Sequence, residues 1–216
     1  RNNWKVINGS WYYFDGSGWM VTGWLKRASS WYYLEPGNGN MVTGWRKIGS
    51  TWYYLASDGK MLTGFQNIGG SKYYLNTGSG AMAVGWLQLG SDWYYMNGSG
   101  VMQTGWLYQN HAWYYLLGNG AMYTGWLWDR DQWYFMYSDG SMATGMITVG
   151  NADYYQAPSG ETLYGWIWKG DAWCYADADG VIQKNMWKWI DGECYYFDST
   201  GNMAVDTWID GCYVNS

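Results

Sequence analysis

Residues 105–124 read GWLYQNHAWYYLLGNGAMYT, and the rest of the chain is a series of variants of this stretch. Its aromatic triplet, Trp113-Tyr114-Tyr115, has counterparts spaced 20 or 21 residues apart. A tryptophan, or a residue that replaces it, stands seven residues before each triplet, as Trp106 does here. A fixed period of this length is the signature of a repeat protein. The triplets begin at positions 11, 31, 52, 72, 93, 113, 133, 153, 173 and 194.

Each repeat is predicted to be a β-hairpin. Two short aromatic stretches flank turns such as Asn8-Gly9 and Asp191-Gly192. These dipeptides favour two-residue hairpin turns, because both central residues need positive φ. An isolated hairpin is marginal in water, so burial has to come from stacking each hairpin on its neighbours. The expected fold is all-β, a solenoid of stacked hairpins that runs as a single module over residues 1–216.

The composition favours a half-exposed aromatic surface. Aromatic residues make up 22% of the chain, with 20 Trp and 23 Tyr against only 4 Phe, and charged residues make up 13%. Trp and Tyr offer a large ring with a polar tip, which suits surfaces that line a ligand. The net charge of −5 argues against nucleic acid as a partner and suits a cation. No apolar run is long enough for a membrane span.

The chain lacks the patterns of metal and catalytic sites. Cys174, Cys194 and Cys212 occur without a CxxC spacing or a histidine partner, so neither a metal nor a cofactor is expected. Two alternatives stay open for them: one disulfide with a leftover thiol, or three buried thiols. His111 lies at a predicted turn, and the scattered carboxylates form no pair suited to glycoside hydrolysis. The chain begins at Arg1 in mid-pattern, so it is expected to be a non-catalytic portion of a longer protein.

Alternation along the second strand predicts where the rings meet. Trp113 and Tyr115 share one face of that strand, and Tyr114 points to the other. If one face looks forward along the stack and the other backward, Trp113 meets Tyr134 of the next repeat. The candidate site is therefore the boundary between two repeats.

Stretches 23–45, GWLKRASSWYYLEPGNGNMVTGW, and 85–106, GWLQLGSDWYYMNGSGVMQTGW, resemble the choline-binding cell-wall repeat of bacterial surface proteins and lysins. The resemblance covers essentially the whole chain. It implies a left-handed hairpin solenoid that binds choline or phosphocholine of teichoic or lipoteichoic acids, in cages of two Trp from one repeat and a Tyr from the next, walled by a Met. It also implies a secreted protein at the bacterial cell wall or cell surface, and pairing of two copies through a terminal hairpin.

Two other functions remain open. Related repeats bind α-glucans or form receptor-binding toxin tails, so a carbohydrate-binding module is the main alternative. The rings could also serve only as contacts between hairpins in a structural stalk. The Trp-rich triplet and the recurrent methionine favour choline.

Carried over residue by residue, the resemblance predicts seven usable boundaries. The methionines that follow these hairpins are the expected fourth walls: Met20, Met41, Met61, Met102, Met122 and Met142, with Ile182 in the corresponding place after Trp173. The predicted sets are Trp4, Trp11, Tyr32; Trp24, Trp31, Tyr53; Trp45, Trp52, Tyr73; Trp86, Trp93, Tyr114; Trp106, Trp113, Tyr134; Trp126, Trp133, Tyr154; and Trp166, Trp173, Tyr195.

Three boundaries depart from the pattern. Phe65 with Lys72, and Met146 with Asp153, replace both tryptophans at once, so these two boundaries are expected to be empty. In the last repeats Cys194 stands at the triplet start, and the aromatic positions are interpreted as shifted to Trp187 and Trp189. Residues from about 181 to 216 are expected to form divergent capping units.

Overall fold

Strands are the only regular elements within residues 2–215, which the computed structural model describes. They are β1 (Asn3–Ile7), β2 (Ser10–Phe14), β3 (Gly23–Arg27), β4 (Ser30–Leu34), β5 (Gly44–Ile48), β6 (Thr51–Leu55), β7 (Gly64–Ile68), β8 (Ser71–Leu75), β9 (Gly85–Leu89), β10 (Asp92–Met96), β11 (Gly105–Gln109), β12 (Ala112–Leu116), β13 (Gly125–Asp129), β14 (Gln132–Met136), β15 (Gly145–Val149), β16 (Ala152–Gln156), β17 (Gly165–Trp168), β18 (Trp173–Ala176), β19 (Met186–Ile190), β20 (Glu193–Phe197), β21 (Thr207–Ile209) and β22 (Cys212–Val214).

Each consecutive pair of strands forms its own two-stranded antiparallel sheet, which confirms the hairpin prediction. In the hairpin β11–β12 the register sets Trp106 opposite Tyr115 and Tyr108 opposite Trp113. The predicted turn Asn8-Gly9 has φ of 51° and 80°. Turns without glycine adopt the same conformation: Asn110 and His111 have φ of 50° and 65°. Asn tolerates positive φ, and the tight hairpin imposes it on the residue that follows.

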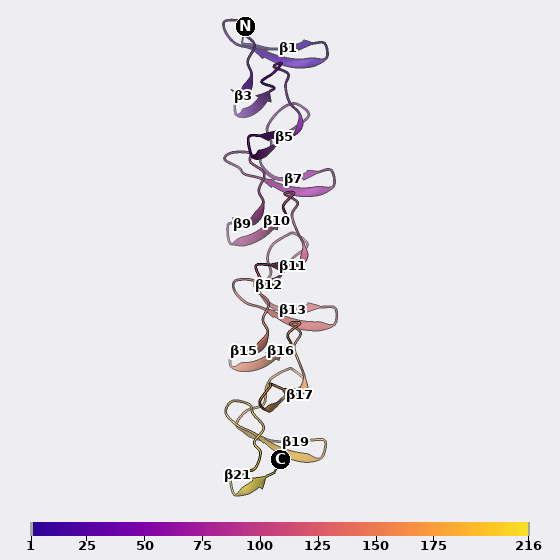
Figure 1. Ribbon diagram of the computed structural model, residues 1–216, viewed down its shortest axis with the longest axis vertical. Coiled ribbons are helices and arrows are strands. Elements are labelled where there is room, and N and C mark those ends of the chain that lie inside the picture. The colour runs from indigo at the N-terminus through magenta and orange to yellow at the C-terminus, as the bar shows by residue number, and fades with distance from the viewer. Residues whose placement is uncertain (1, 216) are drawn as a thin grey trace. The chain divides into compact units, whose positions relative to one another are not determined.

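Contacts group the chain into two units. The first comprises residues 1–104 with 118–121, and the second comprises 105–117 with 122–216. Within the first unit, the β1–β2 and β7–β8 hairpins point the same way, so the orientation returns at every third hairpin (Figure 1). Within the second unit, β13–β14 and β19–β20 are related in the same way. Each unit is thus a solenoid of stacked hairpins, as predicted, whereas the left-handed winding, the single module and the capping role stay predictions.

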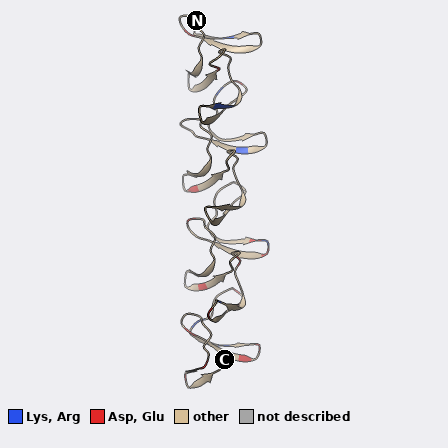
Figure 2. Ribbon diagram, viewed as in Figure 1, with Lys and Arg blue, Asp and Glu red and all other residues tan. Residues whose placement is uncertain are grey.

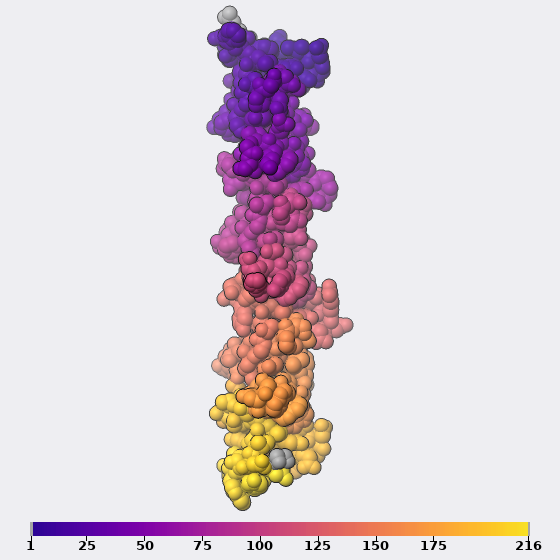
Figure 3. Space-filling view, viewed as in Figure 1, coloured from indigo at the N-terminus to yellow at the C-terminus, as the bar shows by residue number. Residues whose placement is uncertain are grey.

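The surface of each unit consists of projecting hairpins. Some hairpin tips stand out from the surface in the space-filling view (Figure 3). Few charged positions fall on the strands of either unit (Figure 2). Among the described residues, no helix is long and apolar enough to cross a membrane.

The buried core is a narrow row of side chains at the ends of the second strands. Leu34, Leu55 and Leu75 are each 0% exposed. Each forms a bridge to the methionine of the following connection, as Leu55 does to Met61. Burying a leucine contributes roughly 1.5–3 kcal/mol, so this row supplies much of the stability that a lone hairpin lacks. The tryptophans therefore lie on the faces of the hairpins, outside this buried row.

Candidate functional site

Trp24, Trp31 and Tyr53 enclose a pocket between the β3–β4 and β5–β6 hairpins. The two indole rings lie 6.2 Å apart, centroid to centroid, and are nearly perpendicular at 87°. The Tyr53 ring lies 4.9 Å from that of Trp24. Three aromatic faces thus border one small space.

Alternation within the hairpin places these rings. Trp24 and Trp31 lie on one face, because Trp24 is paired with Tyr33, two residues beyond Trp31. Tyr33 packs across its own hairpin onto Trp24 at 5.1 Å. The first tyrosine of the next triplet, Tyr53, reaches Trp24 from the other side. The ring contact is thus made by the tyrosine that the facing argument predicted, and its role in binding stays a prediction.

The contact between the first Trp and the next tyrosine recurs in five further predicted sets, and the nearly perpendicular Trp pair recurs in four of those five. The first Trp approaches the Tyr of the next hairpin at centroid distances of 4.7 to 5.0 Å: Trp4–Tyr32, Trp45–Tyr73, Trp106–Tyr134, Trp126–Tyr154 and Trp166–Tyr195. Nearly perpendicular Trp pairs at 6.3 to 6.4 Å are Trp45–Trp52, Trp106–Trp113, Trp126–Trp133 and Trp166–Trp173. Trp86 and Trp93 form such a pair in the first unit at 6.4 Å. Their set includes Tyr114 of the second unit and stays a prediction.

The second tryptophan of each pair is the open wall. Trp31, Trp52 and Trp133 are 38%, 41% and 40% exposed. An indole that serves only as core would be buried, since each ring has a large apolar area to remove from water. These exposed faces therefore leave the pockets accessible from solvent.

The methionine of each pocket comes one connection later than the sequence reading placed it. Met61, not Met41, lines the Trp24 pocket, and Met82, not Met61, lines that of Trp45. The same offset gives Met142, not Met122, to the Trp106 pocket. The cause is a backbone hydrogen bond: the Met61 N–H donates to the Trp31 carbonyl at 2.8 Å.

This bond reassigns the remaining predicted walls. Met41 donates to the Trp11 carbonyl, so it belongs to the first set in place of Met20. The Met102 N–H donates to the Lys72 carbonyl, which assigns Met102 to the Phe65 boundary, where both tryptophans are replaced. Ile182 likewise donates to Asp153 and not to Trp173, whose carbonyl accepts from Met203. Sequence reasoning missed Met82 and Met203, because the rotation between hairpins decides which connection reaches which pocket.

A serine from the connection one hairpin further on completes three of the pockets. Ser79, Ser99 and Ser159 line those of Trp24, Trp45 and Trp106. The glycine that follows Ser79 allows the turn to approach: Gly80 has φ of +76°, and a Cβ there would lie 2.3 Å from the Met61 sulfur. The repeated Ser-Gly pairs were the available signal in the sequence. Each pocket thus uses three successive repeats.

The boundary at Phe65 holds an ammonium group of the protein itself. Phe65 contacts Tyr94 at 5.3 Å, as Trp does in the regular sets. The Lys72 Nζ lies 4.9 Å from the centroid of the Phe65 ring. A cation over an aromatic face is attracted by the ring quadrupole. Lys72 therefore both repels an incoming cation and covers a face that the cation would need, which supports the expectation of an empty boundary.

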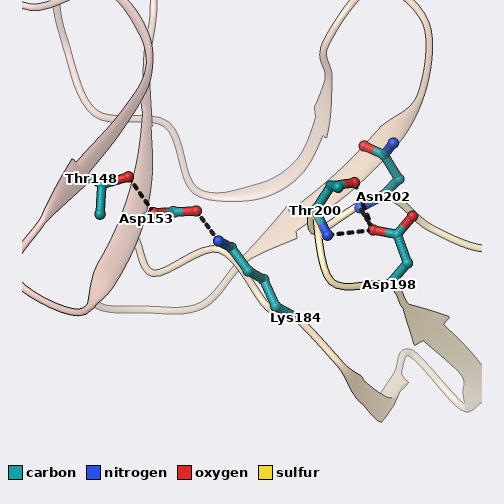
Figure 4. A network of polar contacts seen from close by, with 6 residues as sticks. All are labelled: Thr148, Asp153, Lys184, Asp198, Thr200 and Asn202. Atoms are coloured by element: carbon teal, nitrogen blue, oxygen red, sulfur yellow. Dashed lines mark hydrogen bonds and ion pairs between the residues drawn. The ribbon is translucent and has the colours of Figure 1, made fainter.

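The boundary at Met146 is also occupied by charges of the protein. Asp153 accepts a hydrogen bond from Thr148 Oγ1 at 2.7 Å and forms an ion pair with Lys184 (Figure 4). Partial burial alone would raise the pKa of Asp153, but the hydrogen bonds from Lys184 and Thr148 outweigh it and hold the pKa below the ordinary value.

The last repeats correct two sequence-based expectations. Trp187 packs on Tyr196 at 5.3 Å, the cross-strand contact of every regular repeat, so the aromatic positions have not shifted. Trp189 instead projects from the hairpin and is 73% exposed. The cysteines are free thiols, and only Cys174 is buried, so neither alternative proposed for them holds. Burial raises the pKa of the Cys174 thiol.

Comparisons with known proteins converge on one family. Sequence profiles of the choline-binding repeat match residues 2–43, 42–85 and 181–216, and a profile of the cell wall binding repeat matches residues 84–102, 104–122 and 124–142. No curated protein matches the chain.

Solved structures from Streptococcus pneumoniae resemble the chain over most of its length. Choline binding protein F, in the presence of a peptidoglycan analogue, is 30% identical, with a TM-score of 0.77 and coverage of 98% of this chain and 89% of that protein. CbpJ from strain TIGR4 is 30% identical, with a TM-score of 0.71 and coverage of 94% of each chain. The modular autolysin LytC is 28% identical, with a TM-score of 0.63, and the match covers 94% of this chain but 48% of the autolysin.

Proposed function

Because the chain belongs to the choline-binding repeat family, we propose that it binds the choline groups of phosphocholine-bearing teichoic or lipoteichoic acids in the cages between successive hairpins. The module is non-catalytic and belongs to proteins of the cell wall. One observation carries the proposal: a nearly perpendicular Trp pair with a Tyr from the next hairpin recurs from boundary to boundary.

The cage chemistry fits a quaternary ammonium ion. Such a group neither donates nor accepts a strong hydrogen bond, so its site needs apolar contact and π faces directed at diffuse positive charge. Trp24, Trp31 and Tyr53 supply three faces, and Met61 adds a polarizable thioether. At the Phe65 boundary, an ammonium group of the protein itself, that of Lys72, already lies over the ring that replaces the first tryptophan.

Repetition compensates for weak single sites. Each face contributes roughly 0.5–2 kcal/mol, so three faces give a few kcal/mol before the costs of association. Affinities per site should be on the order of millimolar. Several cages on one chain engage repeated choline groups on one polymer, and effective concentration then raises the avidity by about 10²–10⁴.

Chromatography on a tertiary- or quaternary-amine resin tests the proposal. The protein should be retained and should elute with free choline, whereas sodium chloride at the same ionic strength should leave it bound. If salt elutes the protein equally well, charge attraction alone explains retention and the cages bind no choline.

Two copies are predicted to pair through a terminal hairpin, which sedimentation with and without choline would reveal.

Exposed aromatic pairs in the second unit favour a second candidate function, glycan binding. Trp128 lies 5.2 Å from Trp133, and Trp168 lies 5.4 Å from Trp173. Trp128 and Trp168 are 53% and 51% exposed, and sugar rings stack on open indole faces. Co-sedimentation with dextran that choline cannot compete away would support this candidate. Loss of co-sedimentation in the presence of choline would assign the binding to the cages.

A further inference from the structure

The pocket of Trp126, Trp133 and Tyr154 differs from the other described cages in its remaining walls. Thr162 stands where Met61 stands in the Trp24 pocket, and Tyr164 adds a further aromatic side chain. Asp179 takes the place that Ser79, Ser99 or Ser159 has elsewhere. Among these four pockets, that of Trp126 therefore has a carboxylate at the position where the other three have a hydroxyl.

The backbone at this pocket follows the regular pattern, so the change is confined to side chains. The Thr162 N–H donates to the Trp133 carbonyl at 2.8 Å, as Met61 does to Trp31. The Thr162 hydroxyl lies 3.1 Å from the same carbonyl and 3.0 Å from Gln156 Oε1, so its single proton is taken up by acceptors of the protein itself. Its methyl group is left as the apolar wall.

The turn that carries Asp179 lies directly against this pocket. A Cβ built on Gly180 would be 3.0 Å from Thr162 Cγ2 and 3.4 Å from Tyr164 Cε1. Asp177 Oδ1 accepts the N–H groups of Asp179 and Val181, at 3.0 and 2.9 Å, which fixes the turn. The carboxylate of Asp177 is thus used within the turn, whereas Asp179 lines the pocket and is exposed to solvent.

We infer that the Trp126 pocket is a cation site selective for organic ammonium ions that carry no adjacent phosphate. The inference rests on the proposed function, since the same rings supply the attraction for the cation. A carboxylate beside the cage attracts the ammonium group and repels a phosphate attached two carbons away. Asp179 is also a charged hydrogen-bond acceptor for ammonium ions that carry N–H groups, whereas the serine of a regular cage is a neutral one.

The neighbouring pocket has the opposite charge beside its rings. Arg130 lines the Trp106 pocket together with Ser159 and Met142. Its Nε lies 3.7 Å from Asp129 Oδ2, which also accepts the Trp106 indole N–H at 2.8 Å. The Arg130 side chain is 83% exposed, so a ligand in the pocket can reach it. Two cages of one unit therefore discriminate differently against phosphate.

Titration of the intact chain with choline and with phosphocholine tests the inference. The indole N–H resonances of Trp133 and Trp31 report the two pockets separately, and Trp133→Phe and Trp31→Phe assign them. We expect the preference for choline over phosphocholine to be about fivefold larger at Trp133 than at Trp31, and to shrink as salt is added. Because Lys26 Nζ lies 5.6 Å from the Trp31 ring, substitutions within each pocket are needed to isolate the carboxylate.

Two reciprocal variants supply that control. Asp179→Ser should remove most of the preference at Trp133, and Ser79→Asp should create one at Trp31. An unchanged ratio in both variants overturns the inference while choline still binds. If neither resonance moves with choline, the proposed function itself fails, so the two failures are distinguishable.

Discussion

Two neighbouring boundaries of the first unit share a backbone and differ in what fills them. The Trp45 boundary is an open pocket with Trp52 as its exposed wall, and the Phe65 boundary has the Lys72 ammonium over its ring. Ring contacts within the hairpin are equal, at 5.1 Å for both Trp45–Tyr54 and Phe65–Tyr74.

The backbone bonds between repeats are equal as well. Met82 N–H donates to the Trp52 carbonyl and Met102 N–H to the Lys72 carbonyl, each at 2.8 Å. Leu55 and Leu75 at the strand ends are both fully buried. The stack therefore depends on the leucine row and the backbone hydrogen bonds. The residues at the two Trp positions can differ between boundaries, and ligand binding can differ with them, while the stack is kept.

The largest effect is expected from a change in the buried leucine row, which the two boundaries share. Leu55→Ala leaves a cavity in the buried row, so the free energy of unfolding should fall by about 2–5 kcal/mol in urea titrations. Leu117→Ala is the control, because Leu117 is 37% exposed and its truncation should change stability little. Equal losses in the two variants would contradict the assignment of the stability to the buried leucine row.

A smaller effect should follow from removing only the open wall. Trp52→Ala deletes one of three aromatic faces, so choline affinity at that pocket should fall about tenfold while stability changes far less than in Leu55→Ala. Trp113→Ala should do the same in the second unit. Calorimetry would show one fewer choline bound per chain at millimolar concentrations, and an unchanged stoichiometry would argue against these cages.

A third prediction concerns building a cage at the Phe65 boundary, so that it matches the Trp45 boundary. Phe65→Trp combined with Lys72→Trp should add one choline to the binding stoichiometry, because the backbone of that boundary already matches its neighbour. Lys72→Ala alone should leave the stoichiometry unchanged, since two tryptophans are still missing. A gain of a full site in the single variant would show that Lys72 alone keeps the boundary empty.

The smallest effect concerns pH at the Met146 boundary. Asp153 has a pKa below its ordinary value of 3.8, so its interactions stabilise the fold above that pH and are lost as the pH falls through the lowered folded-state pKa. Lys184→Met should weaken this acid dependence of stability, measured by thermal unfolding between neutral pH and pH 3. The Trp45 boundary lacks this pair, so Trp52→Ala should leave the acid dependence unchanged.

The aromatic residues of each cage could be predicted from the sequence. The seven-residue offset between Trp24 and Trp31 places both on one face of a hairpin, and alternation identifies Tyr53 as the partner. These relations are local, because strand geometry fixes them within one repeat and its neighbour. The departing pair at Phe65 and Lys72 was visible for the same reason.

The tertiary structure decided which more distant segments complete each cage. Met61 and Ser79 reach the Trp24 pocket from later connections, and Asp179 reaches that of Trp126. Their positions depend on how far the chain turns and rises from one hairpin to the next, and a repeat pattern contains no measure of that rotation. By itself the sequence determined the hairpins and the rings. Stacking alone decided the walls that distinguish one cage from another, because they come from connections that follow the next hairpin and the hairpin after it.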